Sequence, residues 1–131
     1  MAAKDLHNIK DATGTVFESG VTIKPYSMGN SGTSTLTPNA ALSNIFHIDA
    51  TGDFTLDGPS NGVDGQRIVV RIKQDGTGSR ILTLGTGIAL GADIIAVTLS
   101  TGIDVTDYLG LIFNSLSNAW HVISFIKGFA V

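Results

Sequence analysis

The sequence predicts an all-β domain, namely an antiparallel β-sandwich or jelly-roll-like barrel of about eight to ten short strands with an extended N-terminal arm. From Asn44 onward, short apolar runs of period two follow one another, and Gly, Asp or Asn interrupts them at intervals of roughly ten residues. The 16 glycines suit tight turns, which need residues that tolerate positive φ. No stretch with helical period and caps competes with this interpretation.

The segment NIFHID predicts the first strand of this series. Phe46 and Ile48 share one face if the segment is a strand, whereas a helix would separate them by roughly 200°. Phe54 and Leu56 predict the next strand, after a turn at residues 50–52.

The segment QRIVVRIKQ is the clearest strand in the chain. Ile68, Val70 and Ile72 alternate and predict a core face. The opposite face then carries Arg67, Val69, Arg71 and Lys73. A slip by one residue would bury three cations, so we expect the register to be well fixed.

The turn at residues 75–78, DGTG, leads into residues 79–84, and together they predict a β-hairpin over 66–84. Apolar runs at 94–99, 108–113 and 120–126 predict at least three more strands. The sequence itself suggests no tandem repeat with a period of about twenty to fifty residues.

Two parts of the chain differ in composition. We expect an N-terminal arm and flexible connector over residues 1–34 and a β-sandwich domain over 35–131, because residues 27–38 read SMGNSGTSTLTP. The arm's apolar side chains are too sparse for a core of their own and are our candidate partner-binding residues. They are Leu6, Ile9, Val16, Phe17, Val21 and Ile23.

Composition limits the partners. Of the 131 residues, 43% are hydrophobic and only 15% charged, well below the roughly 25% that is usual. Such a surface, rich in neutral polar groups, loses little on burial against neighbouring copies. The net charge is −3 and the cations are scattered, so we expect no nucleic-acid partner. No apolar stretch reaches the roughly 18 residues of a membrane span, so we expect no membrane partner.

No set of residues in the sequence has the spacing of a catalytic or cofactor site. His7, His47 and His121 lie in unrelated segments, and we expect structural or surface roles for them. The chain has no Cys and no GxSxG motif, which removes the thiolate nucleophile and the nucleophile elbow. We therefore expect no catalytic residue, no cofactor and no enzymatic activity.

Four aspartates are candidates for a metal site. Asp49, Asp53 and Asp57 recur every four residues, but on the β interpretation they flank turns, where an Asp side chain accepts hydrogen bonds from nearby amides. The alternative is a weak calcium site near Asp53, Asp57 and Asp64.

Two further features have two interpretations each. Arg67, Arg71, Lys73 and Arg80 would share one face of the predicted hairpin, either as a solvated face or as a binding surface for an acidic partner or a phosphate backbone. Trp120 follows a predicted turn, which favours an anchor between sheets over a sugar-stacking platform.

Residues 35–85 carry several marks of one module: an F-x-I strand, a G-x-x-T-L strand, a Pro-Ser-Asn turn and the run DGQRIVVRIKQDGTGSR. This segment resembles a β-module of tailed-phage structural proteins, and AVTLSTGIDVTDYLGLIFNSLSNAWHVISF is similar to the module's closing strands. The resemblance covers roughly residues 35 to 125. It departs at Leu84, where an aromatic is usual, and in the loop GIALGADII, which replaces a Phe-Pro-Gly-Gly-like loop.

The resemblance implies a role in the virion, assembled in the host cytoplasm. A single module with one arm favours a capsid decoration, or cement, protein that binds the major capsid protein or other virion proteins as a homo-oligomer, with a trimer favoured. The alternative is a tail-fibre or tail-tip module that binds carbohydrate near Trp120. A small hydrolase or lyase would need convergent polar groups, which the sequence does not supply.

Overall fold

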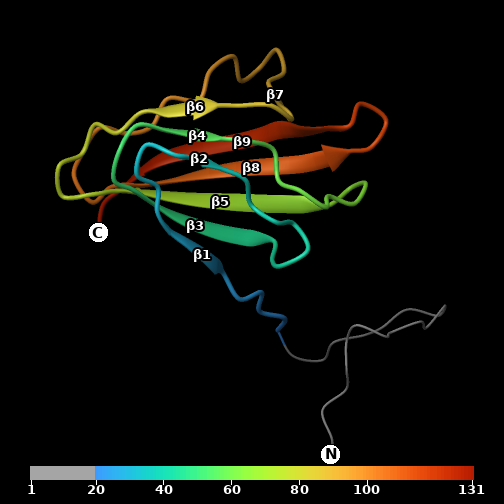
Figure 1. The fold of residues 1–131 in the computed structure, drawn as a ribbon, viewed down its shortest axis with the longest axis horizontal. Coiled ribbons are helices and arrows are strands. Elements are labelled where there is room, and N and C mark those ends of the chain that lie inside the picture. Colours follow the sequence, from blue (N-terminus) through green and yellow to red (C-terminus); the bar gives the residue numbers. More distant parts are fainter. Residues whose placement is uncertain (1–19) are drawn as a thin grey trace, which may run out of the picture.

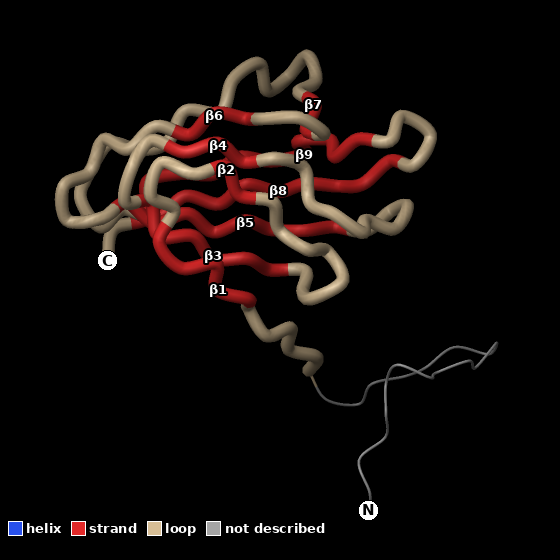
Figure 2. The backbone as a smooth tube through the Cα atoms, viewed as in Figure 1, coloured by secondary structure: helices blue, strands red, loops and turns tan. Residues whose placement is uncertain are grey.

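The computed structural model describes residues 20–131, which form nine strands in two facing sheets and no helix (Figure 1). The strands are β1 Tyr26–Asn30, β2 Thr35–Leu36, β3 Ile45–Ala50, β4 Phe54–Leu56, β5 Arg67–Gln74, β6 Leu82–Leu84, β7 Ile88–Ala89, β8 Thr106–Asn114 and β9 Ala119–Phe129. The large sheet has the order β1-β3-β5-β8-β9-β7 and the small sheet the order β2-β4-β6 (Figure 2). The predicted all-β, sandwich-like class is thus confirmed, and so is the number of strands. Among the described residues, no helix is long and apolar enough to cross a membrane.

The strand pairing is mixed, so the expectation of an antiparallel fold was wrong in that respect. Strands β1 to β6 alternate between the two sheets, and β1-β3-β5 and β2-β4-β6 are each parallel throughout. Only the pairs β5-β8 and β8-β9 are antiparallel. Alternation of period two occurs in both kinds of pairing, so it cannot distinguish them.

The first six strands form a coil of three stacked rungs, where a rung is one strand from each sheet: β1 with β2, β3 with β4, and β5 with β6. On the small sheet Thr35, Thr55 and Thr83 lie in register. In the same way Leu36, Leu56 and Leu84 are stacked, and they point into the core. The coil is therefore a structural repeat that our sequence prediction missed, because the third rung is longer than the first two and hides the period.

The predicted hairpin over 66–84 was wrong. Strands β5 and β6 belong to different sheets, and the turn at residues 75–78 carries the chain across from one to the other. The long hairpin of the structure is instead β8-β9, closed by a turn in which Asn118 adopts a φ of 49°.

Strand β5 has the predicted register. Ile68, Val70 and Ile72 are at most 1% exposed, whereas Arg67 and Val69 are exposed on the other face. In the next rung, Phe46 and Ile48 are both fully buried, as the strand interpretation of that segment requires.

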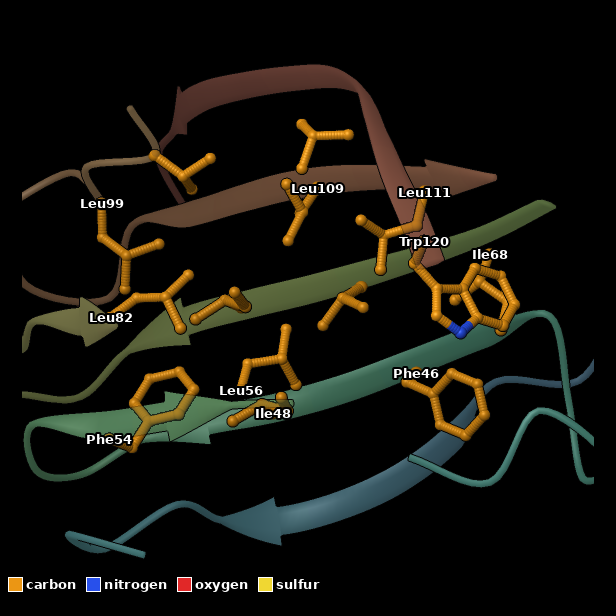
Figure 3. Packing of buried hydrophobic residues seen from close by; sticks show 14 of the residues in the cluster. Phe46, Ile48, Phe54, Leu56, Ile68, Leu82, Leu99, Leu109, Leu111 and Trp120 are labelled. Atoms are coloured by element: carbon orange, nitrogen blue, oxygen red, sulfur yellow. The ribbon is translucent and has the colours of Figure 1, made fainter. Parts of the chain in front are cut away.

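The core fills the space between the sheets, with apolar side chains from both layers and from the hairpin (Figure 3). Leu109 and Leu111 cover it from β8, and Val97 and Leu99 contribute from a segment expected to be a strand. In the structure, residues 94–99 are buried in part but form no strand.

The segment interpreted as a flexible connector is part of the sheets from Tyr26 onward. Strand β1 pairs with β3, and after it the Ser31 amide donates to the Asp49 carbonyl at 2.8 Å. Backbone pairing of this kind holds a segment in place without many apolar side chains, which is why composition alone was misleading.

Candidate interaction surface

Strand register places the side chains on the outer face of the large sheet in rows. Arg71 of β5 lies opposite Tyr108 of β8, and Tyr108 lies opposite Ile126 of β9. In the neighbouring row, Val69 lies opposite Gly110. Cross-strand neighbours are close enough for their side chains to interact, so each row acts as one surface.

Four large side chains of β8 and β9 make an apolar patch on this face, which we call the hairpin patch. They are Tyr108, Ile123, Ile126 and Phe129, which are 36%, 52%, 57% and 50% exposed. The rings of Tyr108 and Phe129 meet edge to face, with centroids 5.5 Å apart. Exposed apolar side chains that adjoin one another mark interaction sites more often than scattered ones do.

A polar group of three borders the hairpin patch through Arg71. The Nε of Arg71 donates to Nδ1 of His47 at 3.0 Å, and Nε2 of His47 lies 3.0 Å from Asp49. Because Nδ1 accepts, Nε2 carries the proton and donates to Asp49 in the neutral ring. His47 therefore has a structural role on the sheet face.

The predicted row of four cations is broken. Arg67, Arg71 and Lys73 do share the outer face of β5, but Lys73 lies 3.6 Å from Asp104. Arg80 lies beyond the turn and pairs with Asp75 at 2.8 Å. That hydrogen bond lowers the pKa of Asp75 to about 2 and raises the pKa of Arg80.

Trp120 is the predicted anchor between the sheets. It is 1% exposed, its indole N–H donates to the Pro59 carbonyl at 2.9 Å, and its ring packs on Phe113. At Gly62 a Cβ would lie 2.6 Å from the Trp120 ring, so a glycine is needed there. A ring this deeply buried cannot stack on a sugar, which overturns the platform interpretation.

A shallow hollow of about 340 Å³ lies at the turn end of the β8-β9 hairpin, where Asp64, Phe113, Leu116 and His121 contribute to its wall. His121 also lines a second hollow of about 330 Å³ toward Ile123. Nε2 of His121 lies 3.1 Å from the Ser117 hydroxyl. His121 thus lines both hollows, and the second also adjoins Ile123 of the hairpin patch.

The structure does not bring the three candidate calcium ligands Asp53, Asp57 and Asp64 together. Asp53, Asp57 and Asp64 accept hydrogen bonds from the backbone amides of Ile81, Thr86 and Ser115, respectively. No group of three or more metal-ligating side chains occurs within residues 20–131. Each carboxylate instead joins its turn to a segment distant in the sequence, which is a longer-range role than the local one we expected.

Four of the six candidate arm residues, Leu6, Ile9, Val16 and Phe17, lie outside the described residues, as does His7. The other two, Val21 and Ile23, are 63% and 43% exposed. They precede β1 in a stretch, residues 20–25, that is exposed throughout.

No family model, curated protein or solved structure matches the chain.

The hairpin patch was missed by our sequence analysis, although the sequence carries a signal for it. A strand with one solvated face alternates between apolar and polar residues, whereas a strand covered on both faces is apolar throughout. YLGLIF in β8 and VISFI in β9 are almost continuously apolar. That pattern is typical of strands that are covered on both faces.

Proposed function

We propose that the chain is a non-enzymatic structural protein of a phage virion, namely a capsid decoration (cement) protein that binds the outer shell as a homo-oligomer, with a trimer favoured. The hairpin patch carries the proposal. The resemblance of residues 35–125 to a phage β-module supplies the biological setting, and the exposed Val21 and Ile23 supply a second apolar contact.

The energy of such attachment is modest for one copy. The side chains of the hairpin patch are about half exposed, so burying each contributes roughly 1 kcal/mol. Association itself costs several kcal/mol in lost freedom. Several copies joined in one oligomer overcome this cost together, so decoration depends on multivalency.

The experiment adds purified protein to undecorated phage heads and measures occupancy. Ile126→Ser in the hairpin patch should reduce occupancy several-fold. Ile95→Ser is the matched control, because Ile95 is 81% exposed but lies outside the patch. If both variants decorate heads like the parent, the hairpin patch is not the attachment surface.

The arm is tested in the same assay. Deleting residues 1–19 removes Leu6, Ile9, Val16 and Phe17 and should lower occupancy at every salt concentration, because the two lysines and three acidic residues removed with them nearly cancel in charge. Undiminished decoration would remove the arm from the mechanism.

A tail module is the second candidate, favoured by the hollow beside His121. It would place a carbohydrate against Asp64 and Asn114 rather than on Trp120. Protein that binds separated tails and not heads would decide for this candidate and against the decoration role.

A further inference from the structure

The first two rungs of the coil repeat with a period of 20 residues. Tyr26 pairs with Phe46, Thr35 with Thr55 and Leu36 with Leu56. A side-chain hydrogen bond repeats the spacing, since the Thr51 amide donates to the Ser31 hydroxyl 20 residues earlier.

The first rung is the open end of this coil. Within residues 20–131, no strand pairs with the outer side of β1 or of β2. Tyr26 is 45% exposed, whereas Phe46 at the equivalent position is fully buried. Leu36 is half-buried and Leu56 fully buried. An uncovered edge of this kind presents unpaired backbone groups that can take up another strand.

The same period continues upstream in the sequence. Leu6, Thr15 and Val16 stand 20 residues before Tyr26, Thr35 and Leu36, respectively. Nine residues, 17–25, separate Val16 from Tyr26, and nine residues, 37–45, separate Leu36 from Phe46. Residues 6–16 therefore have the spacing of one further rung, and we call them the 6–16 segment.

One departure in the 6–16 segment fits an end position. Asn8 stands 20 residues before Met28, which packs against the core. A terminal repeat of a stacked coil faces water on one side, and polar residues there are the usual cap.

The chain leading into the first rung is directed away from that rung's own edge. Residues 20–25 are exposed throughout and lead away from both sheets (Figures 1 and 2). The Ser43 hydroxyl holds this course by donating to the Lys24 carbonyl at 2.8 Å. The segment that covers the open rung therefore comes more readily from a neighbouring copy.

We propose that the open edge of β1 and β2 in one copy binds the 6–16 segment of a neighbouring copy as a parallel fourth rung. Leu6 then lies over Tyr26, and Thr15 lies opposite Thr35. Exchange of identical elements between copies is a low-cost route to an oligomer. This arrangement rests on the proposed function, which requires an oligomer. It names what the arm binds, namely the open edge of a neighbouring copy.

Cysteine cross-linking tests this register, and the chain has no native cysteine to interfere. Thr15→Cys and Thr35→Cys proteins, one carrying a size tag, are mixed at full length and oxidised. Parallel neighbours lie about 4.8 Å apart, within the range that a disulfide spans. The mixed disulfide should form at least tenfold faster than with the Glu18→Cys control, whose side chain lies three positions out of register.

Two results would overturn the proposal. If the mixed disulfide forms no faster than with the Glu18→Cys control, the 6–16 segment does not bind the open edge. A Thr15→Cys/Thr35→Cys double variant that closes only within single molecules, even in concentrated solution, assigns the fourth rung to the same chain and not to a neighbour.

Light scattering gives an independent readout. Val16 is equivalent to Leu36 and Leu56, which point into the core, so Val16→Asp places a carboxylate at an inward position of the fourth rung. This variant should convert the oligomer to monomer. His7→Asp, on an outward position of the same segment, should leave it intact; equal behaviour of the two variants contradicts the register. If the disulfide forms between copies but the protein does not bind phage heads, the exchange of segments stands and only the decoration role fails.

Discussion

The two ends of the coil contain the same kinds of side chain in different surroundings. At the third rung, β8 pairs along the whole of β5, and Val97 and Leu99 pack into the core beside β6. At the first rung, nothing in the described part of the chain covers the edge. The burial of a stacked side chain thus depends on whether a further layer follows it, and stability is distributed accordingly.

The largest effect is expected next to the covered end. Val70→Asp puts a carboxylate at a fully buried position, which costs several kcal/mol, on the order of the whole stability of a small domain. Val69→Asp is the matched control, since Val69 is the next residue of β5 and is 36% exposed. Circular dichroism should find the first variant unfolded and the second folded. A Val70→Asp protein that melts like the parent would show that β5 is not central to the core.

How much of this the sequence predicts depends on the strand. For β5, alternation of apolar residues with Arg67, Arg71 and Lys73 defines both faces, because a slip would bury charge. In β9 no comparable signal exists, because Val122, Ile123 and Phe125 would be acceptable on either face. A bulge between Gly110 and Leu111 then decides which of them point outward.

The sequence did not predict which strands pair with one another, for a different reason. Residues 75–78 suit a tight hairpin turn, yet Gln74 and Asp75 bind the chain that follows and take it to the other sheet. The side-chain amide of Gln74 forms two hydrogen bonds with the backbone of Arg80. Its oxygen accepts from the Arg80 N–H, and its nitrogen donates to the Arg80 C=O. Such contacts depend on the folded layers, so local turn preference gave the wrong answer.

The candidate surface was predictable only in part. The apolar continuity of β8 and β9 is visible in the sequence, but the meeting of Tyr108 with Phe129 depends on the hairpin register. The sequence could not show that Asp53, Asp57 and Asp64 lie apart, because each accepts a hydrogen bond from a different distant amide.

Equivalent leucines measure the difference between the ends directly. Leu56→Ala in the middle rung should cost about 2–5 kcal/mol, the usual range for a buried leucine. Leu36→Ala at the open rung should cost roughly half as much, because that side chain is only half-buried. Urea denaturation gives both values. Equal losses would mean that the open rung is covered in solution, which the 6–16 segment would explain.

A somewhat smaller effect is expected where the hairpin closes the core. Gly62→Ala places a methyl group against the Trp120 ring and should cost about 1–3 kcal/mol through overpacking. Gly76→Ala is the control, because Gly76 has no heavy atom within 4 Å of the added Cβ and no positive φ. Thermal melts compare the two. A Gly62→Ala protein as stable as the Gly76→Ala protein would show that the ring has room to move.

The smallest effect concerns the turn of the third rung, where the pH dependence of stability reports on one carboxylate. The hydrogen bond from Arg80 lowers the pKa of Asp75 from 3.8 to about 2, and the amides of Gly78 and Thr77 act in the same direction. Because the folded pKa lies below the unfolded one, the folded state is favoured by ionisation of Asp75. That contribution is complete above about pH 4 and declines as the pH falls toward 2.

Asp75→Asn removes the titrating group while keeping an oxygen that accepts from the amides. The melting temperature of the parent should therefore fall more steeply between pH 4 and pH 2 than that of the variant, and the difference between them should be constant from pH 5 to 7. High salt should narrow the difference, since the pair is partly open to solvent. Parallel curves through the acid range would mean that Arg80 and Asp75 separate in solution, and that the covered end is held by its apolar contacts and the Gln74 bonds alone.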